Sequence, residues 1–361
     1  MISFEDIKTI AAQFELSREI VSFLPIEEGN INGTFKITAA DGTDYLLQNI
    51  NTTVFRNTEI LMHNVEAVCA YLSKKLEGDP SGMISLYCFP CKNGKKYYTD
   101  DAGRVWRVYN YVGNSRCYSI LTSPEQFYKT GRAFGEFQKL LADFPIEELG
   151  DTIPDFHNTA KRYETLLESA EKDVKGRLAS CLPEYEFVRA RAADTHVLTD
   201  LLAAGKLPLR VTHNDTKINN ILFDADTMEP KCVVDLDTVM PGLSLYDFGD
   251  AIRSGAATAA EDETDLSKMS MSLELYEAYT KGYLSAAGES LTPLEIEYLP
   301  FSAKLLSLEC GMRFLTDYLD GDVYFKTKYS EHNLIRCRTQ FKLVEDIETK
   351  LDEMRRITVL S

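Results

Sequence analysis

The sequence predicts an α+β protein with two lobes, a small N-terminal lobe on an antiparallel sheet and a larger, mainly helical C-terminal lobe. Three observations lead to this fold class. Short runs of strand-forming residues fill the first ~110 positions, helical periodicity dominates after residue 123, and a strand-like island returns at residues 210–237. We place the lobes at residues 1–111 and 112–361, and this length supplies enough apolar material for two joined cores.

The N-terminal lobe begins with a helix, because Ser3 and Asp6 form a capping-box pattern ahead of helically spaced apolar residues. Asp41-Gly42 marks a hairpin turn between later strand-like runs. A long helix is expected to begin near Thr58. The runs expected to form strands cover residues 20–26, 34–38, 45–50, 84–88, 96–99 and 104–111.

The C-terminal lobe is expected to be built from helices with clear starting signals. Ser123-Pro124-Glu125 places proline in a first helical turn, and Thr292 with Glu295 forms a second capping box. Helical spacing of apolar residues continues in several segments. These cover residues 158–172, 273–287 and 292–319.

Composition excludes several function classes. Lysine and arginine total 39 and aspartate and glutamate total 56, so the formal net charge is 39 − 56 = −17. This charge speaks against non-specific binding of nucleic acid and disfavours anionic membranes. The sequence shows no signal peptide and no spanning segment, so we expect a cytoplasmic protein with no nucleic-acid, membrane or obligate protein partner.

The chain has eight cysteines, which is too few for a disulfide framework at this length, and we expect reduced thiols. Cys88 and Cys91 form a lone CxxC. A redox pair or half of a zinc site would need a second such pair or a nearby histidine, so a strand end followed by a turn is the simpler interpretation.

Candidate catalytic residues cluster in the island at residues 210–237. Two apolar strands joined by an acidic turn predict a β-hairpin there. His213-x-Asp215 and Asn220 precede the first strand, and Asp235 ends the second. The hairpin therefore brings Asn220 and Asp235 to one end of neighbouring strands, with Asp215 in the loop before them.

These residue types suit phosphoryl transfer, which needs alignment and charge neutralisation more than covalent chemistry. Asp215 is the candidate catalytic base that accepts the proton of an attacking hydroxyl. Asn220 and Asp235 are candidate ligands for Mg²⁺ on the phosphates of ATP, since magnesium prefers oxygen donors and takes the rest from phosphate and water. The spacing H-x-D-x-x-x-x-N, followed by a strand and Asp, is typical of the protein-kinase-like fold.

Three residues are assigned supporting positions around this set: His213, Asp237 and Asp247. We expect Asp247 to brace the catalytic loop by accepting backbone N–H bonds. Asp250 is expected in solvent or at a helix start. An isolated H-x-D is common, and Asp235-Leu-Asp237 alone could be the D-x-D metal motif of a sugar-nucleotide enzyme, but the combined spacing favours the kinase interpretation.

These motifs resemble the aminoglycoside phosphotransferase and choline kinase superfamily. The segments RVTHNDTKINNIL, DLDTVMPGLSLYDFGD and ECGMRFLTDYLDGDVYF are similar to bacterial N-acetylhexosamine 1-kinases, and the similarity runs from about residue 20 to 350. The resemblance implies that Mg-ATP phosphorylates the anomeric hydroxyl of N-acetylglucosamine or N-acetylgalactosamine. It also implies that Asp215 is the base, that Asn220 and Asp235 bind metal, and that Arg313 and Tyr324 contact the sugar.

The nucleotide side departs from protein kinases. There is no G-x-G-x-x-G, and the candidate phosphate loop at residues 29–34 has an ordinary turn as its equal alternative. Gln48 stands where the phosphate-pairing lysine is expected, so Mg²⁺ would supply most of the neutralising charge. The adenine is expected against the crossover at residues 108–112. The candidate nucleotide contacts are Gly29, Asn32, Gly33, Thr34, Gln48, Tyr109 and Tyr111.

Alternatives remain open for the acceptor. A kinase of the same fold could act on an amine such as an aminoglycoside or choline, which the acidic composition favours and Arg313 opposes. Arg313 could also form a structural ion pair with Glu309. The Gln48 change would suit a nucleotide-binding pseudokinase. A basic stretch at residues 326–342 is either a solvated helix face or an aid to binding an anionic sugar phosphate.

Overall fold

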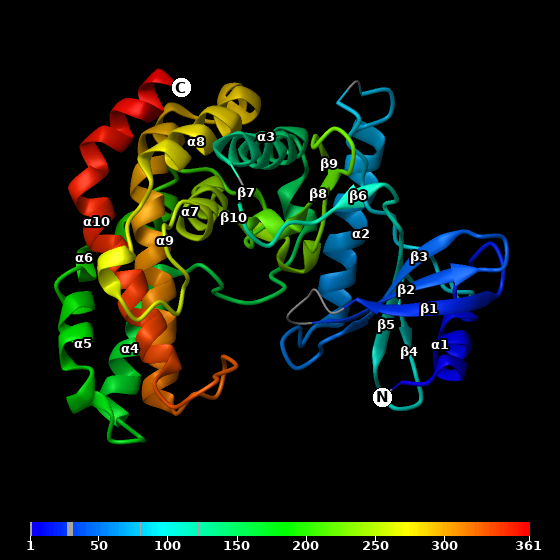
Figure 1. The fold of residues 1–361 in the computed structure, drawn as a ribbon, viewed down its shortest axis with the longest axis horizontal. Helices are drawn as coiled ribbons and strands as arrows, with labels where there is room; N and C mark the ends of the chain where they lie inside the picture. The colour runs from blue at the N-terminus through cyan, green and yellow to red at the C-terminus, as the bar shows by residue number, and fades with distance from the viewer. Residues whose placement is uncertain (1, 27–31, 80, 122) are drawn as a thin grey trace. The chain divides into compact units, whose positions relative to one another are not determined.

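The computed structural model describes residues 2–26, 32–79, 81–121 and 123–361, which form two compact units. The first unit contains residues 1–117, 143–154 and 221–240, and the second contains residues 118–142, 155–220 and 241–361. The predicted division at residue 111 stays a prediction. Both the antiparallel sheet of the first unit and the helices of the second agree with the predicted α+β class (Figure 1).

A five-stranded antiparallel sheet is the centre of the first unit, in the order β1-β2-β3-β5-β4. Its strands are β1 (Ile20–Ile26), β2 (Gly33–Ala39), β3 (Asp44–Ile50), β4 (Tyr98–Thr99) and β5 (Val105–Asn110). The strand expected at residues 84–88 is wrong, since that segment pairs with β5 only at an isolated bridge from Cys88 to Tyr109. Its first residue instead donates its backbone N–H to the Lys231 carbonyl at 2.8 Å, so the segment leaves the edge of β5.

The two faces of this sheet differ in chemistry. Helix α1 (Phe4–Ala11) packs its apolar side on one face, where Ile10 and Phe14 join Leu47 and Val108 in a core, and its capping box is confirmed. Register places Thr34 opposite Gln48, and Gln48 opposite Arg107. Because side chains alternate along a strand, this polar row lies on the face away from α1.

Helix α2 (Thr58–Lys75) begins where the sequence predicts. It hydrogen-bonds to two other segments of the first unit that are far from it in the sequence. Its buried Asn64 donates to the carbonyls of Gly150 (2.6 Å) and Val239 (2.9 Å).

The predicted hairpin is confirmed as β8 (Ile221–Asp224) and β9 (Pro230–Val233), and β6 (Ser115–Arg116) pairs with β8 on the side away from β9.

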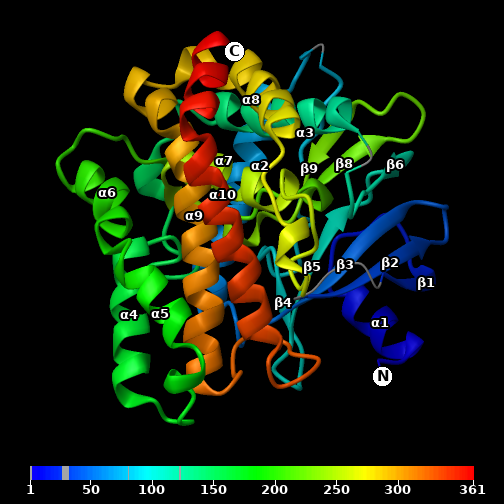
Figure 2. The same ribbon diagram turned by 60° about the vertical axis from the view of Figure 1, so that its left-hand side comes forward.

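The second unit is helical and contains the short paired strands β7 (Arg210–Thr212) and β10 (Met240–Gly242). The predicted helix starts at Ser123 and Thr292 are confirmed as N-caps, and Asn158, the first residue of a segment expected to be helical, caps another helix. The two longest helices, α9 and α10, lie side by side (Figure 2). Its α-helices are α3 (Pro124–Leu140), α4 (Thr159–Lys172), α5 (Leu182–Arg189), α6 (Ala192–Ala203), α7 (Ser244–Gly255), α8 (Leu273–Ala287), α9 (Pro293–Asp320) and α10 (His332–Leu360).

Glycines let α3 and α8 approach each other closely. A Cβ at Gly135 would lie 2.5 Å from the Tyr283 carbonyl oxygen, and one at Gly282 would overlap the Tyr128 carbonyl. The backbones therefore touch where a side chain would separate them. This packing matters for the site because α3 also supplies rings that contact the catalytic loop.

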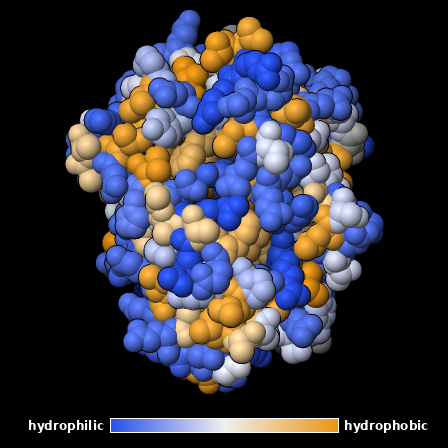
Figure 3. All heavy atoms as spheres, turned by 90° about the vertical axis from the view of Figure 1, so that its left-hand side faces the viewer, coloured by the Kyte–Doolittle hydropathy of each residue, from blue (hydrophilic) through white to orange (hydrophobic). Residues whose placement is uncertain are grey.

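The structure bears on two expectations, one about membrane-spanning helices and one about the cysteines. No helix in the described ranges is long and apolar enough to cross a membrane. None of the eight cysteines, all of which lie in the described ranges, forms a disulfide. Burial raises the pKa of Cys88 to about 12 and that of Cys91 to about 11, and the described residues contain no group of three His, Cys, Asp or Glu suited to a metal. On the face drawn in Figure 3, hydrophobic residues are interspersed with hydrophilic ones.

Candidate active site

The predicted catalytic loop follows β7 in the second unit. His213 is buried there between aromatic rings of α3, with ring centroids 5.6 Å from Phe134 and 5.9 Å from Phe137. Its Nδ1 accepts the backbone N–H of Asp215 at 3.3 Å. His213 is therefore a packed residue that shapes the turn leading to Asp215.

Asp247 holds the same loop from α7. Its two carboxylate oxygens accept the backbone N–H groups of His213 (2.9 Å) and Asn214 (2.7 Å), which is the arrangement that the bracing hypothesis requires. The Thr216 hydroxyl donates to its carbonyl oxygen. Burial raises the pKa of Asp247 to about 6, although the neighbouring N–H groups oppose that rise.

Asp215 is half-buried, and both of its carboxylate oxygens have partners. Asn220 Nδ2 donates to Oδ2 at 3.0 Å and also to the Asp215 carbonyl at 2.7 Å. Lys217 Nζ lies 2.5 Å from Oδ1. These contacts fix the orientation of the carboxylate, and the Asn220 amide nitrogen is committed, so its Oδ1 is the atom left to act as a ligand.

Sequence reasoning missed Lys217, although it stands only two residues after Asp215. Burial disfavours its charge, but the carboxylates of Asp215 and Asp250 outweigh that effect and raise its pKa. The placement of Asp250 in solvent or at a helix start is wrong. Asp250 is buried inside α7 and accepts from Arg253 Nε at 2.9 Å.

Asp235 belongs to the first unit, where it follows β9 in a left-handed conformation with φ 59°. At the paired end of the hairpin, Ile221 lies opposite Val233, so the chain enters from Asn220 and leaves toward Asp235. The donor chemistry of Asp235 and Asn220, a carboxylate and an amide oxygen, fits magnesium, which takes few protein ligands and completes its shell with phosphate and water.

Gln48 faces a cation that the sequence analysis did not anticipate. Arg107, its cross-strand partner on β5, donates to Gln48 Oε1 from Nε (3.0 Å) and Nη2 (2.8 Å). The carboxamide is thereby oriented with Nε2 toward Thr34 Oγ1 at 3.2 Å. Gln48 therefore has a cation as its neighbour, and the charge of that cation is paired with Asp237, so the expectation that Mg²⁺ supplies most of the neutralising charge stays a prediction.

Asp237 is the second side chain that contacts Arg107. Arg107 is 1% exposed and Asp237 is 2% exposed, and Arg107 Nη1 lies 2.5 Å from Asp237 Oδ1. Burial opposes the guanidinium charge, but Asp237 raises the pKa of Arg107 above its usual value. Asn32 Nδ2 donates to Asp237 Oδ2 at 2.6 Å, and the Asn51 N–H donates to Asn32 Oδ1 at 2.9 Å.

The other predicted nucleotide contacts divide into three groups. Gly29 lies outside the described residues. Gly33 begins β2 opposite Asn49. The Tyr109 ring is 2% exposed and Tyr109 is paired with Leu46 of β3, whereas Tyr111 is more open and carries Lys36 Nζ 4.6 Å from its ring centroid.

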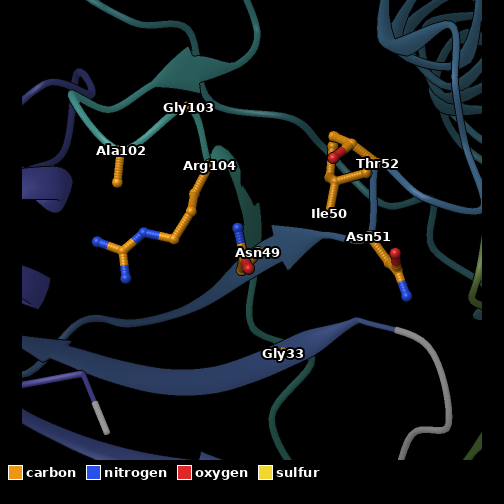
Figure 4. Close-up of a pocket in the computed structure, with 8 residues that line it drawn as sticks. All are labelled: Gly33, Asn49, Ile50, Asn51, Thr52, Ala102, Gly103 and Arg104. Atoms are coloured by element: carbon orange, nitrogen blue, oxygen red, sulfur yellow. The ribbon is translucent and has the colours of Figure 1, made fainter.

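A pocket of about 380 Å³ in the first unit is lined by polar and small residues (Figure 4). Its lining residues are Gly33, Asn49, Ile50, Asn51, Thr52, Ala102, Gly103 and Arg104. Asn49 alternates with Gln48 along β3 and so points to the face that α1 covers. We therefore assign this pocket no part in the nucleotide arrangement.

The predicted sugar contacts lie together in the second unit. Arg313 on α9 is half-buried, and its guanidinium lies 5.4 Å from the Phe156 ring centroid and 5.9 Å from that of Tyr324. The alternative ion pair with Glu309 is not formed, because Glu309 Oε1 contacts His157 Nδ1 at 2.8 Å. No carboxylate pairs with Arg313 within the described part of the chain.

Two features surround this guanidinium. Tyr324 is 61% exposed on a loop whose successive N–H groups, from Val323 to Phe325, bind Asp317 at 2.8–3.0 Å. Arg162 lies nearby on α4, where burial and the positive charge of Arg313 lower its pKa. The surroundings of Arg313 are therefore cationic and aromatic.

The basic stretch is largely ion-paired. In the stretch 326–342, basic side chains form ion pairs with nearby glutamates. The pairs are Arg338 with Glu184 at 2.6 Å, Arg336 with Glu261 at 3.7 Å and Lys342 with Glu345 at 3.1 Å. This pairing favours a helix face packed against acidic neighbours over an anion-binding surface.

Comparison with known proteins identifies the family. The model of the phosphotransferase enzyme family matches residues 22–291. An aminoglycoside phosphotransferase from Alicyclobacillus acidocaldarius is similar in structure, with a TM-score of 0.60 and 12% identity over 100% of this chain and 97% of that chain. An amicoumacin kinase in complex with AMP-PNP and Ca²⁺ gives 0.59 and 14% over 97% and 94%.

A choline kinase from Cryptosporidium parvum gives a TM-score of 0.53 and 13% identity over 97% of both chains. At such identities the structural likeness shows the fold, while the family match covers most of the chain. The chain therefore belongs to the phosphotransferase enzyme family, with the fold of aminoglycoside and choline kinases.

Proposed function

We propose that this phosphotransferase moves the terminal phosphoryl group of ATP to the anomeric hydroxyl of an N-acetylhexosamine, giving the sugar 1-phosphate. The observation on which the acceptor depends is the Arg313 guanidinium, which lies among aromatic rings beside Arg162. A buried or half-buried cation needs acceptor atoms, and the hydroxyl and acetamido oxygens of such a sugar would supply them.

Asp215 is the proposed catalytic base. Lys217 and Asn220 hold its carboxylate from two sides, and a carboxylate has further lone pairs with which to accept the proton of the acceptor hydroxyl. Asn220 and Asp235 would hold Mg²⁺, which when bound neutralises phosphate charge. The nucleotide and divalent cation in the similar amicoumacin kinase complex support this part of the proposal.

An amine acceptor is the second candidate, favoured by the net charge of −17 and by the aminopropanol, ethanolamine and choline kinases among the similar structures. The local charge opposes it. A protonated amine near Arg313 and Arg162 would meet like charges, which disfavours binding by more than the distant acidic surface attracts it.

A matched acceptor screen tests the proposal. Purified protein with Mg-ATP is offered N-acetylglucosamine, N-acetylgalactosamine, glucose, ethanolamine, choline and an aminoglycoside. We expect ADP release with the acetamido sugars and a product phosphorus signal coupled to the anomeric proton. Asp215→Asn is the inactive control. Turnover with the amines alone would contradict the sugar proposal and leave the phosphotransferase assignment intact.

A further inference from the structure

A continuous polar chain crosses the first unit on the face of the sheet away from α1. It runs from Asn32 through Asp237, Arg107 and Gln48 to Thr34, with each link between 2.5 and 3.2 Å. Both ends therefore return to the described part of the candidate phosphate loop, at Asn32 and Thr34. A buried cation stands in the middle, and its two described oxygen partners are an amide and a carboxylate.

We infer that Arg107, whose charge is paired with Asp237, orients and polarises Gln48, and that Gln48 replaces the expected lysine as the group that meets phosphate. This inference rests on the proposed function for the identity of the ligand. Arg107 is a positioning residue, because its guanidinium points at Gln48 and Asp237 and is almost fully buried.

The physical argument concerns the carboxamide. With two guanidinium N–H groups on Oε1, the amide cannot flip, so Nε2 must present its hydrogens on the side of Thr34. Hydrogen bonds in a chain polarise one another, and the cation at one end strengthens the N–H donors at the other. A negatively charged phosphate would therefore meet an amide donor with a cation directly behind it.

The arrangement also explains why lysine is absent at position 48. An ammonium there would face Arg107 across neighbouring strands at a site with little water, where repulsion between like charges is strong. This row of the sheet accommodates one cation, which pairs with Asp237. That cation is Arg107 on β5, and β3 carries the neutral Gln48 at the facing position.

A charge exchange tests the inference, with affinity for a non-hydrolysable ATP analogue plus Mg²⁺ measured by calorimetry and folding followed by Tm. Gln48→Leu should weaken analogue binding by at least ~10-fold with little change in Tm, since one charge-assisted hydrogen bond is lost. Gln48→Lys should weaken binding further and lower Tm. Gln48→Lys combined with Arg107→Gln should return affinity to within ~3-fold of wild type, because one cation remains on the row.

Arg104→Gln is the matched control, because Arg104 is a neighbouring arginine whose ion-pair partner among the described residues is Asp100, and it should leave affinity unchanged. Wild-type affinity in Gln48→Leu, tighter binding in Gln48→Lys alone, or no recovery in the exchange would each overturn the inference. Wild-type protein that binds the analogue but phosphorylates no acetamido sugar refutes the acceptor proposal only. Failure of wild-type protein to bind the analogue refutes both.

Discussion

Asp215 is held by contacts that orient it without filling its proton-accepting capacity. Asp215→Asn should keep the fold and nucleotide affinity but lower kcat by ~10²- to 10⁴-fold, the usual contribution of a general base. Steady-state kinetics and calorimetry measure the two quantities. Asp352→Asn, on an exposed carboxylate of α10, is the control. A variant that keeps more than about half of the wild-type rate would remove Asp215 from this role.

The guanidinium of Arg313, which is unpaired among the described residues, leads to a prediction about the acceptor alone. Arg313→Ala should raise the sugar KM or lower kcat/KM by at least ~10-fold, because a charged hydrogen bond of ~1.5–3 kcal/mol is lost. The ATP KM and Tm should barely move, since the guanidinium has no ion pair among the described contacts. Arg355→Ala, on the exposed part of α10, is the control. Early melting, with both substrates affected together, would show a structural role.

Asp247 gives the stability of the protein a defined pH dependence. Its carboxyl has a pKa of about 6 when folded against 3.8 as its ordinary value, so the folded state holds a proton that the unfolded state has released. The resulting stability, about 3 kcal/mol, is present below pH ~4 and is lost as pH rises through about 6. Urea titrations of wild type and Asp247→Asn should therefore diverge in favour of wild type as pH falls from 7 to 4.

The same variant should be impaired at neutral pH. An amide at position 247 offers one acceptor oxygen to the two N–H groups of His213 and Asn214, and an unsatisfied buried donor costs about 1–3 kcal/mol. We expect kcat to fall because the catalytic loop loses one of its fixed points. Parallel stability curves for the two proteins over this pH range would argue against the raised pKa.

At the residue scale, the sequence was informative where a motif is local. The hydrogen bonds from the His213 and Asn214 backbone to Asp247 agree with the predicted brace, whereas the roles of Asp215 and Asn220 stay predictions. Arg107 was missed because it stands inside an ordinary strand pattern and its acidic partner, Asp237, lies far away in the chain. No local signal distinguishes such an arginine, whereas the position of Lys217 beside Asp215 could have identified it.

At the element scale, the crossing of α3 and α8 depends on missing side chains. Gly282→Ala should destabilise the protein by at least about 1–3 kcal/mol, because the added methyl overlaps the Tyr128 carbonyl and the helices must separate. Denaturant unfolding measures this loss. Gly288→Ala is the control, since its Cβ would meet only ordinary contacts at 3.8 Å. Equal stability of the two variants would contradict the close packing.

Elements with capping signals were predicted to within a residue or two, as at Ser3, Ser123 and Thr292. Caps satisfy backbone groups locally, so their signal lies in the sequence. The strand expected at residues 84–88 is wrong because that segment pairs with β5 at a single bridge, and hydrophobic pattern alone does not say how far two segments stay paired.

At the scale of the whole molecule, nucleotide binding is proposed to depend on a magnesium ion held by Asn220 and Asp235. Asp235→Ala should abolish Mg-dependent nucleotide binding, and Asn220→Ala should weaken it less, because only the carboxylate brings charge to the ion. Chelation of Mg²⁺ should reproduce the Asp235→Ala result in wild type. Asp320→Ala serves as a control for removing one acidic side chain. Affinity that ignores both Mg²⁺ and Asp235 would refute the assignment.

Composition does not identify the acceptor. A net charge of −17 is an average over the surface. The cationic surroundings of Arg313 arise from Arg162, on a different helix, and from the commitment of Glu309 to His157. Such local charge depends on which side chains meet after folding, so net charge cannot reveal it.

The rate at which each buried cysteine reacts with an alkylating reagent would report the opening of the unit that contains it. Cys69, Cys88, Cys91 and Cys232 are buried in the first unit, and Cys181 and Cys337 are buried in the second. Burial raises their pKa, so few thiolates exist to react with an alkylating reagent while the fold is intact. Mass spectrometry after timed labelling would therefore record, peptide by peptide, when either half of the molecule opens, without any introduced probe.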